Sequence, residues 1–318
     1  MTGMDSVVVA LALHAAPMSP ATAFATPAFL ASLPCAGTEG AHSEIYGVRS
    51  DGHSAVFVAA NSESRVYKFD LAGHEIAQWS SPYAHGIALS PSGEVFVSSD
   101  SEFGVIDVYS SSGAHLRQFG RWGGPSGGLQ NPTWLYVTPE GTLLVSDSQN
   151  QQVVECDADG NRIRSWGGPG TAAGKFAGPR GIAMDGAGEV LVCDEGNSRV
   201  QVFSRTGAFL RQWPVQSNLL NTYKPVPRGI VIDDLGRIYI ADRLNSRVRV
   251  FQSDGTEIGS WGGSGLDPGY LFGPSEVEVD MLERIYVGES NCHVQVFGRD
   301  GATALPRVTW GALKARYR

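Results

Sequence analysis

Cysteine is scarce in this chain of 318 residues, and its spacing argues against a metal-binding role. The four cysteines, Cys35, Cys156, Cys193 and Cys292, form neither the CxxC spacing of a zinc site nor a dense disulfide framework. Cys156 occupies a position that is Phe in other copies of an internal repeat, so we expect a small buried hydrophobic residue there. No metal and no cofactor is predicted, and the cysteines do not require an oxidising compartment.

Basic residues and long apolar runs are also limited. The chain has 24 Lys and Arg against 32 Asp and Glu, which gives a net charge of −8. Because nucleic-acid binding depends on clustered Lys and Arg, we expect no nucleic-acid partner. No apolar run approaches the roughly 20 residues of a transmembrane helix, so we expect no membrane span.

The first 41 residues lack the positive segment that usually opens a signal peptide, since the first Lys or Arg is Arg49. Residues 6–16, SVVVALALHAA, are the one candidate for a secretory core, with small-residue cleavage options near Ala23 to Ala25. The alternative is a disordered leader rich in Ala, Pro, Ser and Thr. Both alternatives stay open, and so do the secreted and the cytoplasmic locations.

Glycine and proline are abundant, with 40 and 17 residues respectively. These numbers are too high for a helical protein, and there is no collagen-like period. The 42% of hydrophobic residues is enough to bury a core. This composition favours short strands joined by many turns.

A repeat of about 47 residues organises most of the chain. Segments such as 181-GIAMDGAGEVLVCD-194 and 229-GIVIDDLGRIYIAD-242 align with one another and end on an acid. Successive closing acids are 47, 47, 48 and 47 residues apart: Asp100, Asp147, Asp194, Asp242 and Glu289. A weaker copy at residues 45–60 brings the number of repeats to six.

Each copy predicts four strands, because period-two alternation is interrupted by turns rich in Gly, Asp and Ser. The fourth strand ends on an aromatic residue, and the aromatics are Trp79, Phe119, Trp166, Trp213 and Trp261. Six repeats of four strands predict an all-β fold, a six-bladed β-propeller of four-stranded antiparallel blades, over residues 42–311. A basic tail follows at 312–318.

The way in which the ring closes has two alternatives. The last blade has a fourth-strand candidate of its own near residues 302–308. Residues 20–41 of the leader either add an outer strand or stay loose.

The segment 179-PRGIAMDGAGEVLVCDEGNSRVQVFSRTGAFLRQW-213 resembles the NHL-repeat family almost position by position. Members of this family are six-bladed propellers, and the resemblance covers residues 42 to about 310. It implies the propeller fold and a role as a binding or interaction module.

The motifs 194-DEGNSRV-200 and 242-DRLNSRV-248 place an acid and an Arg together in two blades. A catalytic group is needed once per protein, whereas a structural joint is needed once per blade, and counterparts recur in every copy. We therefore expect structural, inter-blade roles for the closing acids and for three arginines, Arg65, Arg199 and Arg247. Duplicated catalytic Asp–Arg pairs are the alternative.

The residues that precede the inner strands converge at one mouth of the predicted channel, where they differ between blades. This ring is Glu44, His85, Thr133, Arg180, Arg228 and Ser275. Variation at a convergent position indicates a ligand-binding site. Arg180 and Arg228 are neighbours that can hold a carboxylate or a phosphate; alternatively they pair with Asp147, Asp194 and Asp242.

A distant resemblance links the chain to the propeller of peptidyl-α-hydroxyglycine amidating lyase. That lyase holds zinc with a His in three alternating blades, where this chain has His85, Arg180 and Ser275. Two of the three ligands are absent, so the resemblance implies the fold and not the zinc site. Its catalytic Tyr falls near Ser148 or Gln149, so this residue is not matched either.

Three functional hypotheses follow from the sequence. The first is a stand-alone, monomeric binding module that holds a protein segment or a small acidic ligand at the channel mouth. The alternative is a lyase or hydrolase with altered site residues. The third is a structural platform that uses the rims of the blades.

Overall fold

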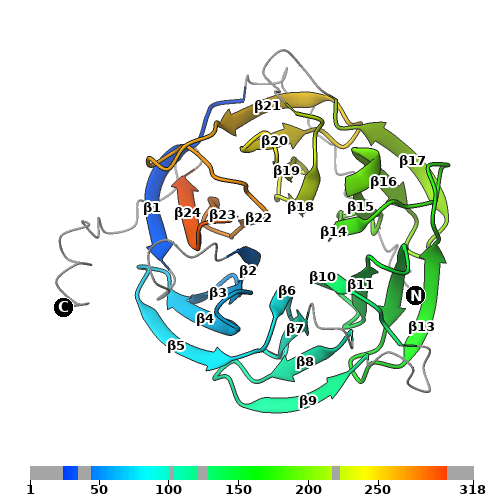
Figure 1. The fold of residues 1–318 in the computed structure, drawn as a ribbon, viewed down its shortest axis with the longest axis horizontal. Coiled ribbons are helices and arrows are strands. Elements are labelled where there is room, and N and C mark those ends of the chain that lie inside the picture. Colours follow the sequence, from blue (N-terminus) through cyan, green and yellow to red (C-terminus); the bar gives the residue numbers. More distant parts are fainter. Residues whose placement is uncertain (1–23, 35–43, 100–103, 121–127, 217–222, 299–318) are drawn as a thin grey trace, which may run out of the picture.

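The computed structural model describes residues 24–34, 44–99, 104–120, 128–216 and 223–298. These residues form six sheets of four antiparallel strands, arranged as blades around a central axis (Figure 1). Apart from one 3-10 turn at Glu195–Asn197, every regular element is a strand. The prediction of a six-bladed propeller is confirmed.

Five blades run in chain order from the inner to the outer strand. Blade one is β2 (Ile45–Ser50), β3 (Ala55–Ala60), β4 (Arg65–Asp70) and β5 (Glu75–Ser80). Blade two is β6 (Ala84–Leu89), β7 (Val95–Ser99), β8 (Ile106–Tyr109) and β9 (His115–Phe119). Blade three is β10 (Pro132–Val137), β11 (Leu143–Asp147), β12 (Gln152–Cys156) and β13 (Arg162–Gly167). Blade four is β14 (Pro179–Met184), β15 (Val190–Asp194), β16 (Arg199–Phe203) and β17 (Phe209–Pro214). Blade five is β18 (Pro227–Ile232), β19 (Ile238–Asp242), β20 (Arg247–Phe251) and β21 (Glu257–Gly262).

Blade six is assembled from two distant parts of the chain. Its inner strands are β22 (Glu276–Val279), β23 (Arg284–Gly288) and β24 (His293–Gly298). Its outer strand is β1 (Ala28–Pro34), which pairs antiparallel with β24. The ring is thus closed by a strand from the predicted leader, while the candidate strand at 302–308 lies outside the described residues. Blade six also meets blade one directly, since the N–H of Ile45 donates to the carbonyl of Glu289 at 3.1 Å.

The hydrophobic core lies between the blades. Second and third strands are buried on both faces because a blade packs against each side, whereas an outer strand such as β5 has only partly buried and exposed positions. One cluster joins Leu191 and Val200 of blade four to Ile230 and Ile238 of blade five. Cys156 is buried, as expected, and burial raises the pKa of its thiol to about 12.

The aromatic residue that ends an outer strand packs beneath a turn of the next blade. Four such joints are described, namely Trp79 with Gly113, Phe119 with Gly160, Trp166 with Gly207, and Trp213 with Gly255. These glycines have φ values between 87° and 89°, and a Cβ atom at any of them would lie within 3 Å of the aromatic ring. Glycine is required there both by the left-handed backbone and by the close contact.

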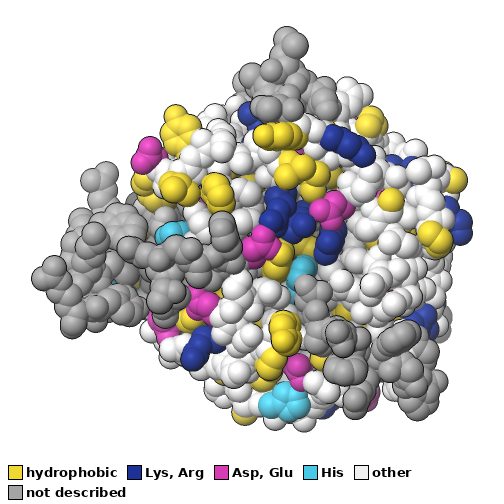
Figure 2. All heavy atoms as spheres, in the orientation of Figure 1, with side chains coloured by type: hydrophobic (Ala, Val, Ile, Leu, Met, Phe, Trp, Pro, Cys, Tyr) yellow, Lys and Arg dark blue, Asp and Glu magenta, His cyan; other side chains and the backbone are white. Residues whose placement is uncertain are grey.

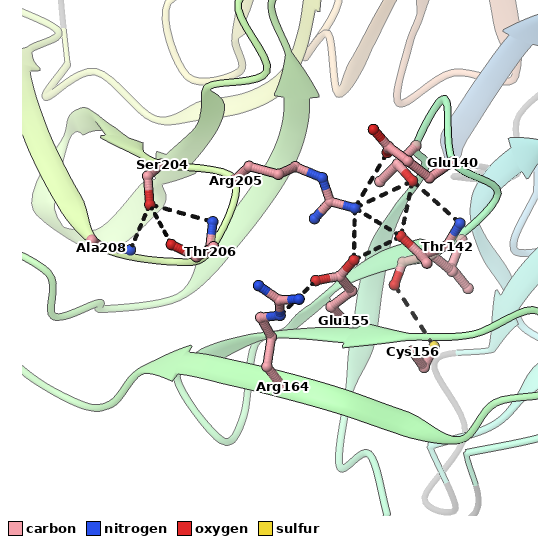
Figure 3. Close-up of polar contacts among 11 residues, drawn as sticks. Glu140, Thr142, Glu155, Cys156, Arg164, Ser204, Arg205, Thr206 and Ala208 are labelled. Carbon is pink, nitrogen blue, oxygen red and sulfur yellow. Dashed lines mark hydrogen bonds and ion pairs between the residues drawn. The ribbon is translucent and has the colours of Figure 1, made fainter.

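Polar side chains add a second joint between blades three and four (Figure 3). Arg205, in the turn between β16 and β17, donates from Nη2 to Glu155 Oε1 at 2.7 Å and to Thr142 Oγ1 at 3.0 Å. Arg164 lies 3.0 Å from the other oxygen of Glu155. Burial tends to raise the pKa of Glu155, but these partners hold it below its ordinary value. The network stabilises the contact between the two blades.

Candidate functional site

We call one face of the ring the loop face, because it carries the linkers between blades and the turns between second and third strands. The Ser or equivalent residue of the NSR motif lies in such a turn with a left-handed backbone. The five described examples have φ between 51° and 58°, and they are Ser64, Gln151, Ser198, Ser246 and Cys292. In four of these turns the carbonyl of this residue accepts an N–H of the following linker. The motif therefore starts the third strand and attaches the linker that leaves the fourth.

The acids that close the second strands hold the preceding linkers. Asp147 accepts the backbone N–H of Gln130 at 3.0 Å, and Asp194 accepts that of Ala177 at 2.7 Å. Asp242 and Glu289 receive equivalent bonds from Val226 and Phe272. These four side chains are at most 1% exposed. Asp100 lies outside the described residues.

The three arginines of the motif do not behave alike. Arg199 donates to Asp194 at 2.7 Å and also to the carbonyls of Thr171, Ala172 and Lys175 in the preceding linker. Arg65 instead donates to Gln78, and Arg247 to Ser260, each within its own blade. In blade five it is Arg249 that lies 3.5 Å from Asp242. Of these three arginines, Arg199 is the one whose described bonds join the closing acid of its blade to the preceding linker.

At the centre of the loop face, one carboxylate bridges Arg180 and Arg228. Glu195 Oε2 lies 2.5 Å from Arg180 Nε, and Glu195 Oε1 lies 3.1 Å from Arg228 Nε. Burial tends to raise the pKa of Glu195, but the two arginines hold it below its ordinary value. The expectation that Arg180 and Arg228 pair with Asp147, Asp194 or Asp242 is therefore wrong. Their partner is the residue that follows Asp194.

A third arginine completes the cluster. Arg243 forms an ion pair with Glu44, which joins blade five to the start of blade one. Arg228 and Arg243 each have a buried Nη1 group without a hydrogen-bond partner. Burial, together with the nearby charges of Arg243 and Arg180, lowers the pKa of Arg228 to about 10. We refer to Arg180, Arg228, Arg243, Glu195 and Glu44 as the charged mouth.

The charged mouth has an excess of positive charge, with three guanidinium groups against two carboxylates. Lys224 lies at its rim, where Nζ donates to the carbonyl of Gly196 at 2.8 Å. Figure 2 shows Lys and Arg side chains gathered over the middle of the ring, with Asp and Glu side chains beside them. A small region of positive potential thus lies on a chain whose net charge is −8.

Aromatic rings lie directly beneath these charges. Arg180 lies over Trp134, and Arg228 over Tyr46, at 5.9 and 5.8 Å from the ring centroids. His85 stacks on Tyr46 with centroids 4.1 Å apart, and its Nδ1 lies 2.8 Å from the carbonyl of Thr133. Burial, and next the charge of Arg180, lower the pKa of His85 well below its ordinary value. His85 is therefore neutral at pH 7, with its Nδ1–H donated to Thr133.

A hydrogen bond crosses the channel below this aromatic layer. The indole Nε1 of Trp134 donates to Glu276, which also lies 3.2 Å from Arg49 Nη1. Arg49 contacts Glu278 as well, at 3.4 Å. Burial raises the pKa of both glutamates, that of Glu278 to about 7. The interior of the channel is thus occupied by its own side chains.

The structure separates the six residues predicted at the mouth into two groups. Glu44, Arg180 and Arg228 lie in the charged mouth. His85, Thr133 and Ser275 are at most 2% exposed, and the hydroxyls of Thr133 and Ser275 bond to neighbouring groups of the fold. At equivalent strand positions the long side chains of Arg180 and Arg228 reach the mouth, whereas the shorter side chains of His85, Thr133 and Ser275 stay buried.

Sequence alignment also overlooked residues that the structure places at the centre. Glu195 and Arg243 directly follow the closing acids, so they lie within the motifs that the sequence indicates to be structural. Tyr46 and Trp134 lie within the inner strands, where an aromatic residue is expected to be core. Disagreement between repeats at these positions was the available signal, because Glu195 aligns with Arg243.

Two absences concern the described ranges of the chain. No helix there has the length and hydrophobicity needed to cross a bilayer. Within the same ranges, His, Cys, Asp and Glu side chains do not form a group of three or more that would suit a metal ion.

Comparison with solved structures finds several propellers of the same overall shape. A gluconolactonase from Xanthomonas campestris superposes with a TM-score of 0.65 at 16% identity, covering 89% of this chain and 99% of the other. A streptogramin B lyase gives 0.63 at 12%, covering 85% and 97%. The WD40 propeller domain of Doa1 gives 0.60 at 12%, covering 87% and 98%. At these identities the likeness concerns the fold alone.

Sequence comparison is more specific. A comparison with curated protein sequences gives no match. The family model of the NHL repeat matches residues 176–203 and 226–251, which cover the first three strands of blades four and five. The resemblance to NHL repeats is confirmed, and the chain is a six-bladed β-propeller that carries NHL repeats.

Proposed function

We propose that this propeller is a binding module whose charged mouth takes an anionic group, such as the carboxylate of a protein segment or of a small acid. The observation that carries the proposal is the pair of buried Nη1 groups of Arg228 and Arg243 that have no acceptor. A buried donor without an acceptor is costly, and an anion placed between two guanidinium groups removes that cost. The ring acts as a monomer in this proposal.

Glu195 sets the selectivity of the charged mouth. Its carboxylate already satisfies the Nε groups of Arg180 and Arg228, so an incoming anion reaches the remaining Nη1 groups or displaces Glu195. Arg180 and Arg228 are held over Trp134 and Tyr46, which limits their movement. Such preorganised guanidinium groups favour anions that offer two oxygen acceptors side by side over anions with a single acceptor.

The test uses malonate, citrate and inorganic phosphate as probes at constant ionic strength. We expect each bound anion to raise the melting temperature, because a ligand that binds only the folded state stabilises it. The double variant Arg228→Ala/Arg243→Ala should lose this stabilisation. Glu195→Gln should increase it, because the mouth then loses its internal carboxylate.

Arg211→Ala is the matched control. Arg211 lies on the outer strand β17, away from the charged mouth, and forms an ion pair with Glu189. It should respond to the anions as the wild type does. If the double variant is stabilised as much as the wild type, the anion-binding proposal is wrong.

An enzyme of the lyase or hydrolase class is the second candidate, and His85 favours it. A neutral His whose Nδ1–H is bonded to a carbonyl has its other nitrogen available as a proton acceptor. The solved structures of similar fold include a streptogramin B lyase and a gluconolactonase. Turnover of a lactone such as glucono-δ-lactone that is lost in His85→Asn would support this candidate over a pure binding module.

A further inference from the structure

Two linkers on the loop face share one backbone conformation. Residues 168–178 lead from blade three to blade four, and residues 263–273 lead from blade five to blade six. Each contains one isolated bridge, Pro169 with Phe176 and Ser264 with Leu271. The N–H of Phe176 bonds to Gly168 O, and that of Leu271 to Gly263 O, both at 2.9 Å. The two linkers therefore align residue by residue without a gap.

Both linkers are anchored in the same way. Phe176 and Leu271 are fully buried. Gly174 N–H donates to Gln201 at 2.8 Å, and Gly269 N–H donates to Gln295 at 2.9 Å. The third anchor is the closing acid of the blade. Asp194 accepts the N–H of Ala177, and Glu289 accepts the N–H of Phe272. In the first linker Arg199 donates to three further carbonyls, and the corresponding position of blade six is His293.

The solvent-facing positions of the two linkers differ in chemistry. Thr171, Lys175 and Ala177 in the first correspond to Leu266, Tyr270 and Phe272 in the second. The side chains of Leu266, Tyr270 and Phe272 are 75%, 52% and 39% exposed. The first linker forms the corresponding bridge and backbone hydrogen bonds without large apolar residues at these positions. Exposed apolar groups that the fold does not need indicate a contact surface.

Two further apolar residues extend this surface toward the charged mouth. Asn245 bonds to both backbone groups of Tyr223, at 3.0 and 3.1 Å, which holds Tyr223 beside the turn that contains Arg243 and Leu244. Tyr223 is 59% exposed and Leu244 49%. The linker of Leu266 joins this turn through the bond from Gly263 N to Ser246 O at 2.8 Å. We call Tyr223, Leu244, Leu266, Tyr270 and Phe272 the apolar arc.

We propose that the apolar arc is a docking surface for an extended segment of a partner protein, one that carries an Asp or Glu residue flanked by apolar side chains. The apolar side chains would pack on Leu266, Tyr270 and Phe272. The acidic side chain would reach Arg243, which adjoins the arc in sequence. The acidic contact rests on the proposed function of the charged mouth, whereas the apolar contact rests only on the comparison of the two linkers.

Charge decides between a partner segment and a second copy of this chain. A symmetric dimer through this face would bring two copies of the charged mouth together, each with an excess of arginine. Like charges at such an interface oppose association. An acidic segment meets the same arginines with complementary charge, and large aromatic residues beside Arg are typical of surfaces that bind protein segments tightly.

The experiment selects random 12-residue peptides, displayed on phage, against the immobilised full chain. Enriched peptides are synthesised with a fluorescent label, and their dissociation constants are measured by fluorescence polarisation. The test variant is Leu266→Thr/Tyr270→Lys/Phe272→Ala, which installs the residues of the matched linker. We expect the enriched peptides to combine an acidic residue with Phe, Leu or Trp, and to bind this variant at least about 30-fold more weakly.

Because all three replacements occur naturally in the first linker, the triple variant should keep the wild-type melting temperature. Thr171→Ala serves as the control on that linker and should bind the peptides normally. Equal affinity for the wild type and the triple variant would overturn the docking surface. So would concentration-dependent dimerisation, seen by light scattering, that the triple variant abolishes.

The two proposals fail in different ways. In one outcome the triple variant loses peptide binding, while the Arg228→Ala/Arg243→Ala variant binds the peptides normally and the wild type binds peptides whose Asp is replaced by Asn. The anion site is then wrong and the apolar contact stands. If malonate and phosphate stabilise the chain through Arg228 and Arg243 while the triple variant still binds the peptides, the docking surface is wrong and the anion site stands.

Discussion

Trp134 of blade three donates its indole N–H to Glu276 of blade six, across the central channel. The two residues are 142 positions apart in the chain, and their blades face one another in a ring of six. This bond connects opposite sides of the ring, which blade-to-blade contacts alone do not do. It also gives Glu276, which is 1% exposed, one of its few polar partners.

Replacing Trp134 by Phe should lower the free energy of unfolding by about 1 to 3 kcal/mol, because a buried carboxylate then loses a hydrogen bond. Urea denaturation measures this change. Trp166→Phe is the matched control, since the Nε1 group of Trp166 is buried and has no acceptor in the described structure. Equal losses in the two variants would show that the Trp134–Glu276 bond contributes nothing beyond packing.

The stability of the fold should decrease with rising pH through Glu278 and Glu289. Burial raises the pKa of each carboxyl group from 4.5 to about 7. The folded chain therefore holds these protons more tightly than the unfolded chain, and the resulting stability is present below pH 4.5 and lost as the pH passes 7. The loss is on the order of 3 kcal/mol per group.

Gln variants at these two positions measure the effect. Glu278→Gln and Glu289→Gln mimic the neutral form, so their stability relative to the wild type should increase between pH 5 and pH 8. Glu75→Gln, at an exposed position, should show a constant difference over the same range. A constant difference in all three variants would contradict the prediction.

Arg205→Ala should lower the free energy of unfolding by about 1 to 3 kcal/mol, because it leaves the buried Glu155 with Arg164 and Thr142 alone (Figure 3). Guanidinium chloride denaturation monitored by tryptophan fluorescence reports the change. Arg211→Ala removes an exposed ion pair with Glu189 and should cost less than about 1 kcal/mol. If Arg205→Ala costs no more than Arg211→Ala, the joint between blades three and four does not depend on this network.

Gly207→Ala should be more destabilising than Gly188→Ala. Both glycines have a left-handed backbone, with φ of 89° and 80°, so the conformational cost of about 1 to 2 kcal/mol is shared. A Cβ atom at Gly207 would lie 2.8 Å from the ring of Trp166, whereas at Gly188 it would meet no atom within 4 Å. The difference in melting temperature between the two variants therefore reports the aromatic contact, and similar values would show that Trp166 moves aside freely.

The repeat, the strands and the number of blades were predictable from the sequence because they depend on local, periodic information. Continuous apolar runs such as that of 190-VLVCD-194 are typical of strands that are buried on both faces. Recurrence of the same pattern near 47-residue intervals indicates units that must pack on one another.

Only the tertiary structure decided how the ring closes and which charges meet. The partner of β24 is a strand that begins at Ala28, and a pairing at that distance along the chain leaves no local trace in either segment. In the same way, Arg180 and Arg228 meet Glu195, while Arg243 meets Glu44. Residue spacing identifies which positions converge on a mouth, but the direction of each side chain and the blade that it faces decide its partner.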